Sequence, residues 1–352
     1  MALANPEQSS PKLNLVVPSR AEKERDATVP DDQGPSARGL LERASTGTLA
    51  DRIFRLVVLG CALSVLFIVA LILSEMLKQS RLSMHEFGWK FFSGHDWDPV
   101  SGVFGATPFI YGTLVSSAIA LIIAVPLGVG VALFMTDICP RVLRGWISYL
   151  VELLAAIPSV IYGLWGIFVL VPLMRTIVEP FLAKYLGWTG LFTGPMYGIG
   201  MLTAGVILAI MVVPFISSVT REVILAVPAS QREAVMALGA TRWETLRTGV
   251  LRNARAGVFG GIVLALGRAL GETMAVTMLI GNRPEITKAL FAPGYTMASV
   301  IANEFSEATE DLYLSALVEI GLALFIVTVI VNVVAQLMIW TITRGHKAGA
   351  HA

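Results

Sequence analysis

Long apolar blocks, separated by short polar segments, organise this chain. Six of the blocks are long enough for a membrane-spanning helix, since a hydrocarbon core about 30 Å thick requires about 20 helical residues. They are residues 53–77, 107–136, 150–174, 197–219, 257–281 and 312–341. Because a helix satisfies its own backbone hydrogen bonds in a medium without water, the pattern predicts an all-α integral membrane protein with six transmembrane helices.

Much of the polar sequence precedes the first block. Residues 1–45 are rich in proline, serine and charged residues, with too little apolar surface to offset the entropy of ordering. We expect a disordered cytoplasmic tail over residues 1–45 and a six-helix transmembrane domain over residues 46–352. Since the tail lacks the short apolar core and cleavage site of a signal peptide, the first apolar block is expected to remain in the mature protein.

Composition excludes several other classes of protein. Of the 352 residues, 55% are hydrophobic and only 14% charged, which excludes an ordinary soluble protein. The 26 basic and 25 acidic residues nearly cancel, which leaves no uncompensated basic stripe for nucleic acid. The two cysteines, Cys61 and Cys139, give neither a disulfide framework nor the ligand spacing of a metal site.

The distribution of basic residues predicts the orientation in the membrane. Both termini and the segments 137–145 and 220–256 fall on one side of six spans, and together they carry 18 lysines and arginines. The segments on the opposite side carry seven. Because cytoplasmic segments are enriched in lysine and arginine, we expect both termini in the cytoplasm.

The segment before the fifth block contains signals for two short helices. Ser230 with Glu233, and Thr241 with Glu244, each match the S/T-x-x-E capping box that begins a helix. Gly239 lies between them, where a left-handed residue would end the first helix. The pattern predicts a cytoplasmic elbow that either docks a partner or lies on lipid headgroups, for which its several arginines would also serve.

Part of this elbow resembles the EAA loop of ABC importer permeases. The resemblance covers about residues 230–252 and rests on Glu-Ala at 233–234 and Gly-Ala at 239–240, although Val235 replaces the usual third alanine. It implies a type I ABC importer permease fold in which the elbow inserts into a cleft on an ATPase subunit. The candidate docking residues are Glu233, Ala234, Leu238, Gly239, Ala240 and Trp243, with Leu238 and Trp243 supplying the apolar contact.

The chain itself contains no phosphate-binding loop for ATP. No Gly-Lys pair occurs in the sequence, so a Walker A motif is absent. We therefore expect a non-catalytic membrane subunit with no cofactor or metal of its own, and ATP with Mg²⁺ bound by a separate ATPase.

A charged pair lies inside the fifth apolar block. Arg268 and Glu272 are four residues apart, so on a continuous helix they share one face. A charged residue at the centre of a membrane helix costs about 2.5–3.5 kcal/mol on insertion scales, which favours a functional role over a self-neutralising pair that only orders the bundle. Gly267 and Gly271 have the spacing that lets another backbone approach closely, and we assign them to helix packing.

The chemistry of this pair fits a partly protonated oxyanion. The Arg268 guanidinium offers a permanent charge and a planar fork of donors. Phosphate retains a proton near neutral pH and can donate it to Glu272, whereas sulfate cannot, and a site built for a donor rejects ligands without one. Arg268 and Glu272 are therefore the predicted substrate-pathway residues.

Further stretches resemble the phosphate-specific branch of these permeases, over roughly residues 50–341. They are Leu-Gly-Arg-Ala-Leu-Gly-Glu-Thr-Met-Ala-Val at 266–276, Ile-Pro-Ser-Val-Ile-Tyr-Gly at 157–163, Trp-Asp-Pro at 97–99 and Ala-Asn-Glu-Phe at 302–305. The last two resemble the C-type subunit more than its A-type partner. The resemblance implies a bacterial inner-membrane heterodimer with a PstA-type permease, a PstB-type ATPase dimer and a PstS-type periplasmic phosphate-binding protein.

Three alternatives remain open from the residues alone. An intramembrane enzyme is disfavoured because His85, His95, His346 and His351 lie outside the apolar blocks and no H-E-x-x-H motif occurs. An ATP-independent channel or secondary transporter would explain Arg268 but would leave the elbow without a role. A permease for another oxyanion, sulfate or molybdate, is compatible with the elbow and less compatible with the residues around Glu272.

Overall fold

A computed structural model describes residues 47–344, so the tail predicted for residues 1–45 lies outside the described residues. Within this range the regular structure is helical, apart from isolated β-bridges between Asp98 and Val103 and between Gly281 and Gly294. The first half contains α3 (Gly47–Gln79), α4 (Arg81–Phe87), α5 (Lys90–Ser93), α6 (Thr107–Leu133), η1 (Phe134–Ile138), α7 (Arg141–Ala156), α8 (Ser159–Trp165), η2 (Gly166–Leu170), α9 (Val171–Leu173), η3 (Met174–Val178), α10 (Glu179–Leu186) and η4 (Gly187–Thr189). The second half contains α11 (Met201–Leu225), α12 (Ala229–Ala237), α13 (Arg242–Glu244), η5 (Thr245–Leu251), α14 (Arg252–Leu270), α15 (Met274–Thr277), α16 (Met297–Glu304) and α17 (Asp311–Arg344).

The described residues include six helical runs that are long and apolar enough to cross a membrane, which confirms the predicted number. These runs are Asp51–Gln79, Thr107–Ile138, Ser159–Thr189, Met201–Leu225, Arg242–Leu270 and Asp311–Thr341. The chain divides into two compact units between Val69 and Ala70, inside α3. The described part of the first unit is an uninterrupted apolar helix, and every other element belongs to the second unit.

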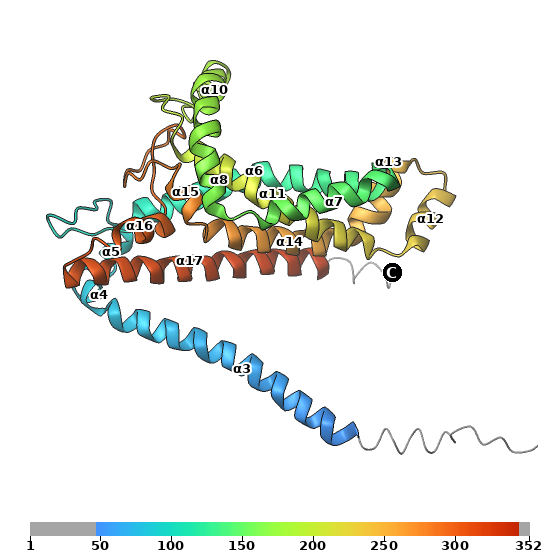
Figure 1. Cartoon of the computed structure of the whole chain (residues 1–352), viewed down its shortest axis with the longest axis horizontal. Helices are drawn as coiled ribbons and strands as arrows, with labels where there is room; N and C mark the ends of the chain where they lie inside the picture. The colour runs from blue at the N-terminus through green and yellow to red at the C-terminus, as the bar shows by residue number, and fades with distance from the viewer. Residues whose placement is uncertain (1–46, 345–352) are drawn as a thin grey trace, which may run out of the picture. The chain divides into compact units, whose positions relative to one another are not determined.

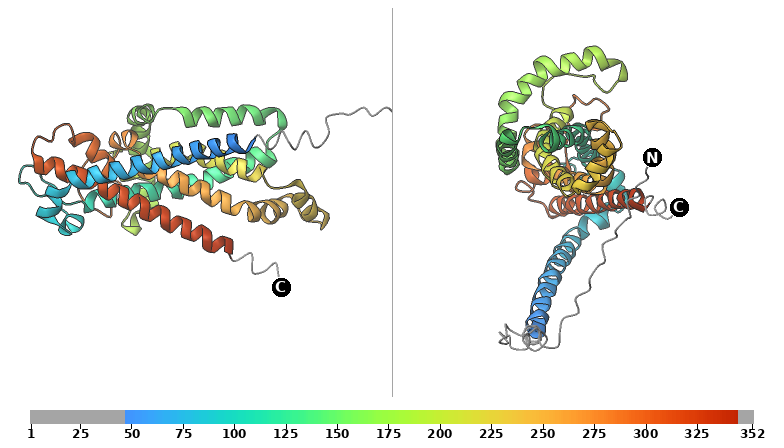
Figure 2. Two further views of the ribbon diagram at one scale, coloured as in Figure 1. Left: turned by 90° about the horizontal axis from the view of Figure 1, so that it is seen from below. Right: turned by 90° about the vertical axis from the view of Figure 1, so that its right-hand side faces the viewer.

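Helix α11 forms the centre of the second unit, where it packs against α6 and α14. Figure 2 (right) views these three helices close to end-on. Small residues allow the close approach: a Cβ added at Gly128 of α6 would lie 2.8 Å from Ile216 of α11, and one at Gly261 of α14 would lie 2.9 Å from Val219. Such contacts are typical of helix pairs in membranes, where backbone approach replaces hydrophobic burial as the source of stability.

The third predicted span is interrupted. A single helix was expected over residues 150–174, but α7 ends at Ala156 and a new helix, α8, begins at Ser159. Pro158 has no N–H to donate and forces the preceding Ile157 into an extended conformation (φ −66°, ψ 129°), so the helix cannot continue. The run from α8 to α10 then leaves the direction of α7 (Figure 1).

The fifth predicted span also ends early. A helix was expected over residues 257–281, but α14 ends at Leu270 and Gly271 adopts φ −92°, ψ 1° as its C-cap. Glu272 and Thr273 are not helical, and only the single turn α15 follows. The charged pair therefore spans a helix end rather than lying within one helix.

The Glu304 carboxylate connects several elements of the second unit. Glu304, at the end of α16, accepts hydrogen bonds from Trp97 Nε1 (2.8 Å), Tyr313 Oη (2.7 Å) and Tyr295 Oη (3.1 Å). Burial, reinforced by the Glu304 carboxylate, raises the pKa of Tyr295 above its ordinary value, so its hydroxyl stays protonated and can donate. Glu304 thereby ties the loop before α6 to α16 and α17.

Candidate functional site

The predicted elbow is present, with one of its two capping boxes. Glu244 donates its backbone N–H to Thr241 Oγ1 (3.3 Å), and Thr241 donates its own to Glu244 Oε2 (2.8 Å). Gly239 adopts the left-handed conformation (φ +84°) just after α12, as predicted. These two features separate α12 from α13 and make the segment an elbow.

The other capping box was a wrong prediction. The N-cap of α12 is Pro228, without a side-chain cap, and Ser230 lies inside the first turn. Pro228 is extended (ψ 138°), and the helix begins at the residue that follows it. Because Ser230 has helical neighbours on both sides, its hydroxyl is not placed to cap the helix with Glu233.

Most candidate docking residues project from the elbow. Leu238 exposes 88% and Trp243 63% of its surface, and Glu233, Ala234 and Gly239 are also exposed. Ala240 is half-buried. The exposed leucine and the exposed tryptophan of the elbow each offer apolar area that a partner can cover.

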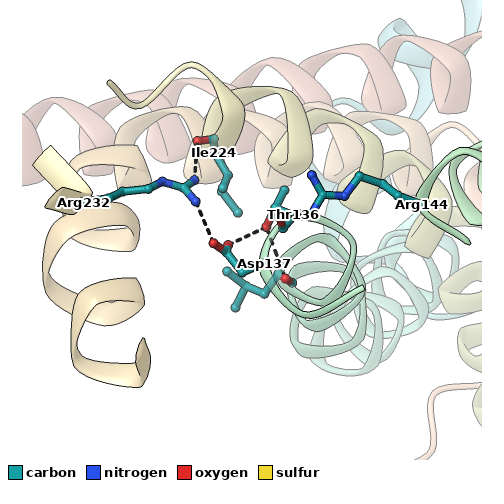
Figure 3. A network of polar contacts seen from close by, with 6 residues as sticks. Thr136, Asp137, Arg144, Ile224 and Arg232 are labelled. Atoms are coloured by element: carbon teal, nitrogen blue, oxygen red, sulfur yellow. Dashed lines mark hydrogen bonds and ion pairs between the residues drawn. The ribbon is translucent and has the colours of Figure 1, made fainter. Parts of the chain in front are cut away.

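A cavity of about 490 Å³ lies beside this surface. It is lined by Asp137, Ile138, Arg232, Met236, Arg242, Trp243, Thr245, Leu246 and Val250. Arg232 of α12 and Asp137 of η1 form an ion pair in its wall, with 2.6 Å between Nη1 and Oδ1 (Figure 3). Sequence reasoning missed this pair because 95 residues separate its members and no local pattern links them.

The two predicted substrate-pathway residues lie at the break after α14. Arg268 is in the last turn of α14, exposed in this chain, with its guanidinium carbon 5.9 Å from the centre of the Phe215 ring. Glu272 is half-buried, and its Oε1 accepts the backbone N–H of Ala275 (3.4 Å). The prediction that both side chains share one helix face was wrong, because the helix ends between them.

The described residues leave part of the α14 face that carries Arg268 open. A Cβ added at Gly267 would meet no atom within 4 Å, and one at Gly271 would meet only the Gly267 carbonyl oxygen, at 3.6 Å. Leu264, one turn earlier, exposes 61% of its surface. If Gly267 and Gly271 are packing positions, as predicted, what packs on them lies outside the part of the chain that the structure describes.

Two of the sequence stretches singled out above pack together behind this site. A Cβ added at Gly163 of α8 would lie 3.2 Å from Ala275 Cα in α15. Tyr162, also on α8, is buried and donates its hydroxyl to the Leu154 carbonyl across the α7–α8 break (2.7 Å). The segment 157–163 thus supports the backbone that follows Glu272.

Comparisons with known proteins agree on one family. The family model of the binding-protein-dependent transport system inner membrane component matches residues 124–342. "Phosphate transport system permease protein PstC" of Mesorhizobium japonicum is 47% identical over 84% of this chain and 91% of its own length. The protein of the same name from Xylella fastidiosa Temecula1 is 48% identical over 84% of this chain and 92% of its own.

A solved structure shares the fold. The crystal structure of a bacterial ABC transporter that imports the acidic polysaccharide alginate has 18% sequence identity and a TM-score of 0.54, over 84% of this chain and 99% of that chain. At this identity the likeness concerns the arrangement of helices, and it agrees with the predicted type I importer fold.

Proposed function

The chain belongs to the family of binding-protein-dependent transport system inner membrane components, and we propose that it is a transmembrane permease subunit of an ATP-driven phosphate importer. The observation that carries this proposal is the 47% identity to a phosphate transport permease over 84% of the chain. Six membrane-length helices give it the multi-pass architecture that such a subunit needs.

Arg268 and Glu272 are this chain's proposed contribution to the phosphate pathway. The uncovered face of α14, with Arg268, Gly267 and Leu264, is the surface expected of one half of a pathway. A related PstA-type permease would supply the other half and would pack on the two glycines. Arg268 would attract the anion, and the Glu272 carboxylate would accept a hydrogen bond from the protonated oxygen of phosphate.

The elbow is the proposed docking site for a PstB-type ATPase dimer. Its exposed Leu238 and Trp243 support an apolar contact, and the capping box at Thr241 gives it a defined shape. ATP and Mg²⁺ would be bound by that ATPase, and this chain would be a non-catalytic subunit. Both termini would lie in the cytoplasm, and a PstS-type binding protein would deliver phosphate on the opposite side of the inner membrane.

Reconstitution of the complete complex tests this function. This chain is co-expressed with the related permease and the ATPase of its source, purified by a tag on this chain, and inserted into vesicles with the elbow side facing the lumen. The binding protein and radiolabelled phosphate are added outside, and uptake is followed with and without ATP enclosed in the lumen, and with excess sulfate outside.

The proposal predicts uptake that requires ATP and the binding protein and that resists competition by sulfate. Uptake at the same rate without ATP would indicate a channel or a secondary transporter. Equal competition by sulfate would indicate a permease for oxyanions in general. Either result would overturn the proposed function.

A further inference from the structure

Arg232 lies on the side of α12 that faces the helix bundle, and it lines the same cavity as the docking residue Trp243. Its guanidinium contacts Asp137 of η1, the π-helical turn that extends α6, at 2.6 Å. The two side chains expose only 23% and 26% of their surface. Partial burial shields such a pair from solvent and salt, so it holds its geometry better than an exposed pair does.

The same guanidinium reaches a second helix. Arg232 Nη2 donates to the carbonyl of Ile224 (3.2 Å), in the last turn of α11. The last carbonyls of a helix lack partners within the helix and carry the negative end of its dipole. A cation at this position therefore caps α11 while it binds Asp137 at the end of α6 (Figure 3).

Asp137 is itself held in place. Its Oδ2 accepts a hydrogen bond from Thr136 Oγ1 (2.8 Å), and the Thr136 carbonyl accepts one from Arg144 Nη2 of α7 (2.6 Å). Arg232 thus contacts α11 and η1 directly, and Arg144 of α7 binds the backbone of the neighbouring Thr136. A displacement of Arg232 would act on the ends of α6 and α11.

Gln231, the residue before Arg232 in α12, contacts a different helix. Gln231 Oε1 accepts a hydrogen bond from Asn253 Nδ2 at the start of α14 (2.7 Å), the helix that ends with Arg268. Two consecutive residues of α12 therefore contact different helices. Gln231 contacts α14, which carries Arg268, and Arg232 contacts η1 and α11.

Two other ion pairs in the described part of the chain are longer, and each has at least one more exposed member. Lys78 and Glu75 lie 3.6 Å apart within one helix, with 62% and 58% of their side-chain surface exposed. Arg221 and Glu152 lie 4.0 Å apart, with 25% and 61% exposed. Neither pair joins the elbow to the bundle.

We propose that Arg232 is a positioning residue that transmits the movement of the docked elbow to the cytoplasmic ends of α6 and α11, through its contacts with Asp137 and the Ile224 carbonyl. This inference rests on the proposed function and adds the route of coupling. Trp243 also lines the cavity that Arg232 and Asp137 line, so an ATPase seated on Trp243 would lie beside this pair. Coupling follows because the pair fits one arrangement of elbow and bundle better than another.

The test compares variants of this chain in the complete reconstituted complex. Arg232→Gln, Asp137→Asn and the double variant are measured for phosphate import and for ATP hydrolysis stimulated by the phosphate-loaded binding protein. Arg247→Gln is the matched control, since Arg247 is an exposed arginine of the adjacent η5. Copurification of the ATPase and the thermal midpoint of the complex report assembly and folding.

The proposal predicts that phosphate imported per ATP hydrolysed falls by about fivefold or more in each single variant, the low end of coupling between linked sites. The double variant should be no worse than Arg232→Gln alone, because Asp137 acts through Arg232. Arg232→Lys should recover part of the loss, since it restores the charge without the second donor to Ile224. Arg247→Gln should match the unmodified chain.

Two outcomes would overturn the inference. One is an unchanged ratio of phosphate to ATP in Arg232→Gln, including the case in which import and hydrolysis fall together because less complex assembles. The other is an effect of the double variant equal to the combined effects of the single ones. Failure of the unmodified complex to import phosphate would instead contradict the proposed function itself.

Discussion

Arg268, the proposed pathway arginine, lies at the end of a helix rather than in the middle of one. It lies two residues before the end of α14, so its side chain comes from the last full turn while Glu272 comes from the non-helical segment beyond. The break frees Glu272 to accept the backbone N–H of Ala275 and fixes its carboxylate at the start of α15. Arginine and carboxylate are thus held independently, and one can be altered without moving the other.

Glu272→Gln should therefore impair phosphate import while leaving Arg268 in place. Loss of a hydrogen bond to a charged group costs about 1.5–3 kcal/mol, which corresponds to a fall in uptake of about tenfold or more. The measurement is the initial rate of radiolabelled phosphate uptake at saturating ATP. Glu285→Gln, at an exposed carboxylate of the following loop, is the control and should import normally. Near-normal uptake in Glu272→Gln would remove the carboxylate from the pathway.

At the scale of elements, hydropathy predicts where helices cross and not where they bend. Pro126 and Pro214 lie inside α6 and α11, which continue past them, whereas Pro158 separates α7 from α8. All three prolines lie in apolar blocks. Whether a helix continues past its proline depends on what packs around the backbone groups that the proline leaves without a partner. The six spans were therefore predictable, and the breaks at Pro158 and Gly271 were not.

The capping boxes show the same limit. Thr241 and Ser230 have the same local signature, yet Pro228 starts α12 two residues before Ser230 and leaves that box unused. The candidate docking residues could be predicted from the sequence because they belong to one short motif. The Arg232–Asp137 pair could not be predicted, because only the folded bundle brings the two residues together.

This difference gives a matched pair of variants in the elbow. Thr241→Ala removes a capping side chain and should cost about 0.5–2 kcal/mol of local stability, so the ATPase should bind less tightly. Ser230→Ala removes an identical type of hydroxyl that caps nothing and should bind the ATPase normally. Affinity is measured between purified ATPase and the detergent-solubilised permease pair. Equal affinity of both variants would show that the capped geometry does not matter for docking.

A second matched pair tests the close packing of α6 on α11. Gly128→Ala places a methyl group 2.8 Å from Ile216, and overpacking of this kind costs about 1–3 kcal/mol. Gly130→Ala, two residues further along α6, meets no atom within 4 Å. The thermal midpoint of the solubilised complex should fall for Gly128→Ala and stay the same or rise for Gly130→Ala. Equal midpoints would mean that α6 and α11 are not held at this distance.

At the scale of the whole molecule, we propose that the two ends of the helix bundle lie on opposite sides of a membrane. The elbow and its ion pair lie at one end of α6, α11 and α14, and the Glu304 network ties the loop before α6 to α16 and α17. Basic residues predominate in the segments on the elbow side. Energy would enter at the elbow and substrate at the opposite side, with Arg268 between them.

Labelling of single cysteines tests this orientation in intact cells. In a background without Cys61 and Cys139, Ser306→Cys should react with a membrane-impermeant maleimide and Thr248→Cys should react only after the cells are opened. Both positions are exposed in the protein. A difference in labelling between them therefore reports which side of the membrane each position faces. Reaction of residue 248 in sealed cells would place the elbow outside and exclude contact with a cytoplasmic ATPase.

The most direct test of the central claim is phosphate import by Arg268→Gln in the complete reconstituted complex. The account predicts that uptake falls by about tenfold or more, while the ATPase copurifies with the variant in normal amount, since Arg268 lies away from the elbow. Arg268→Lys, which keeps the charge but not the planar fork of donors, should lie between the variant and the unmodified chain. Undiminished import by Arg268→Gln would contradict the claim that this guanidinium lines the path of the anion.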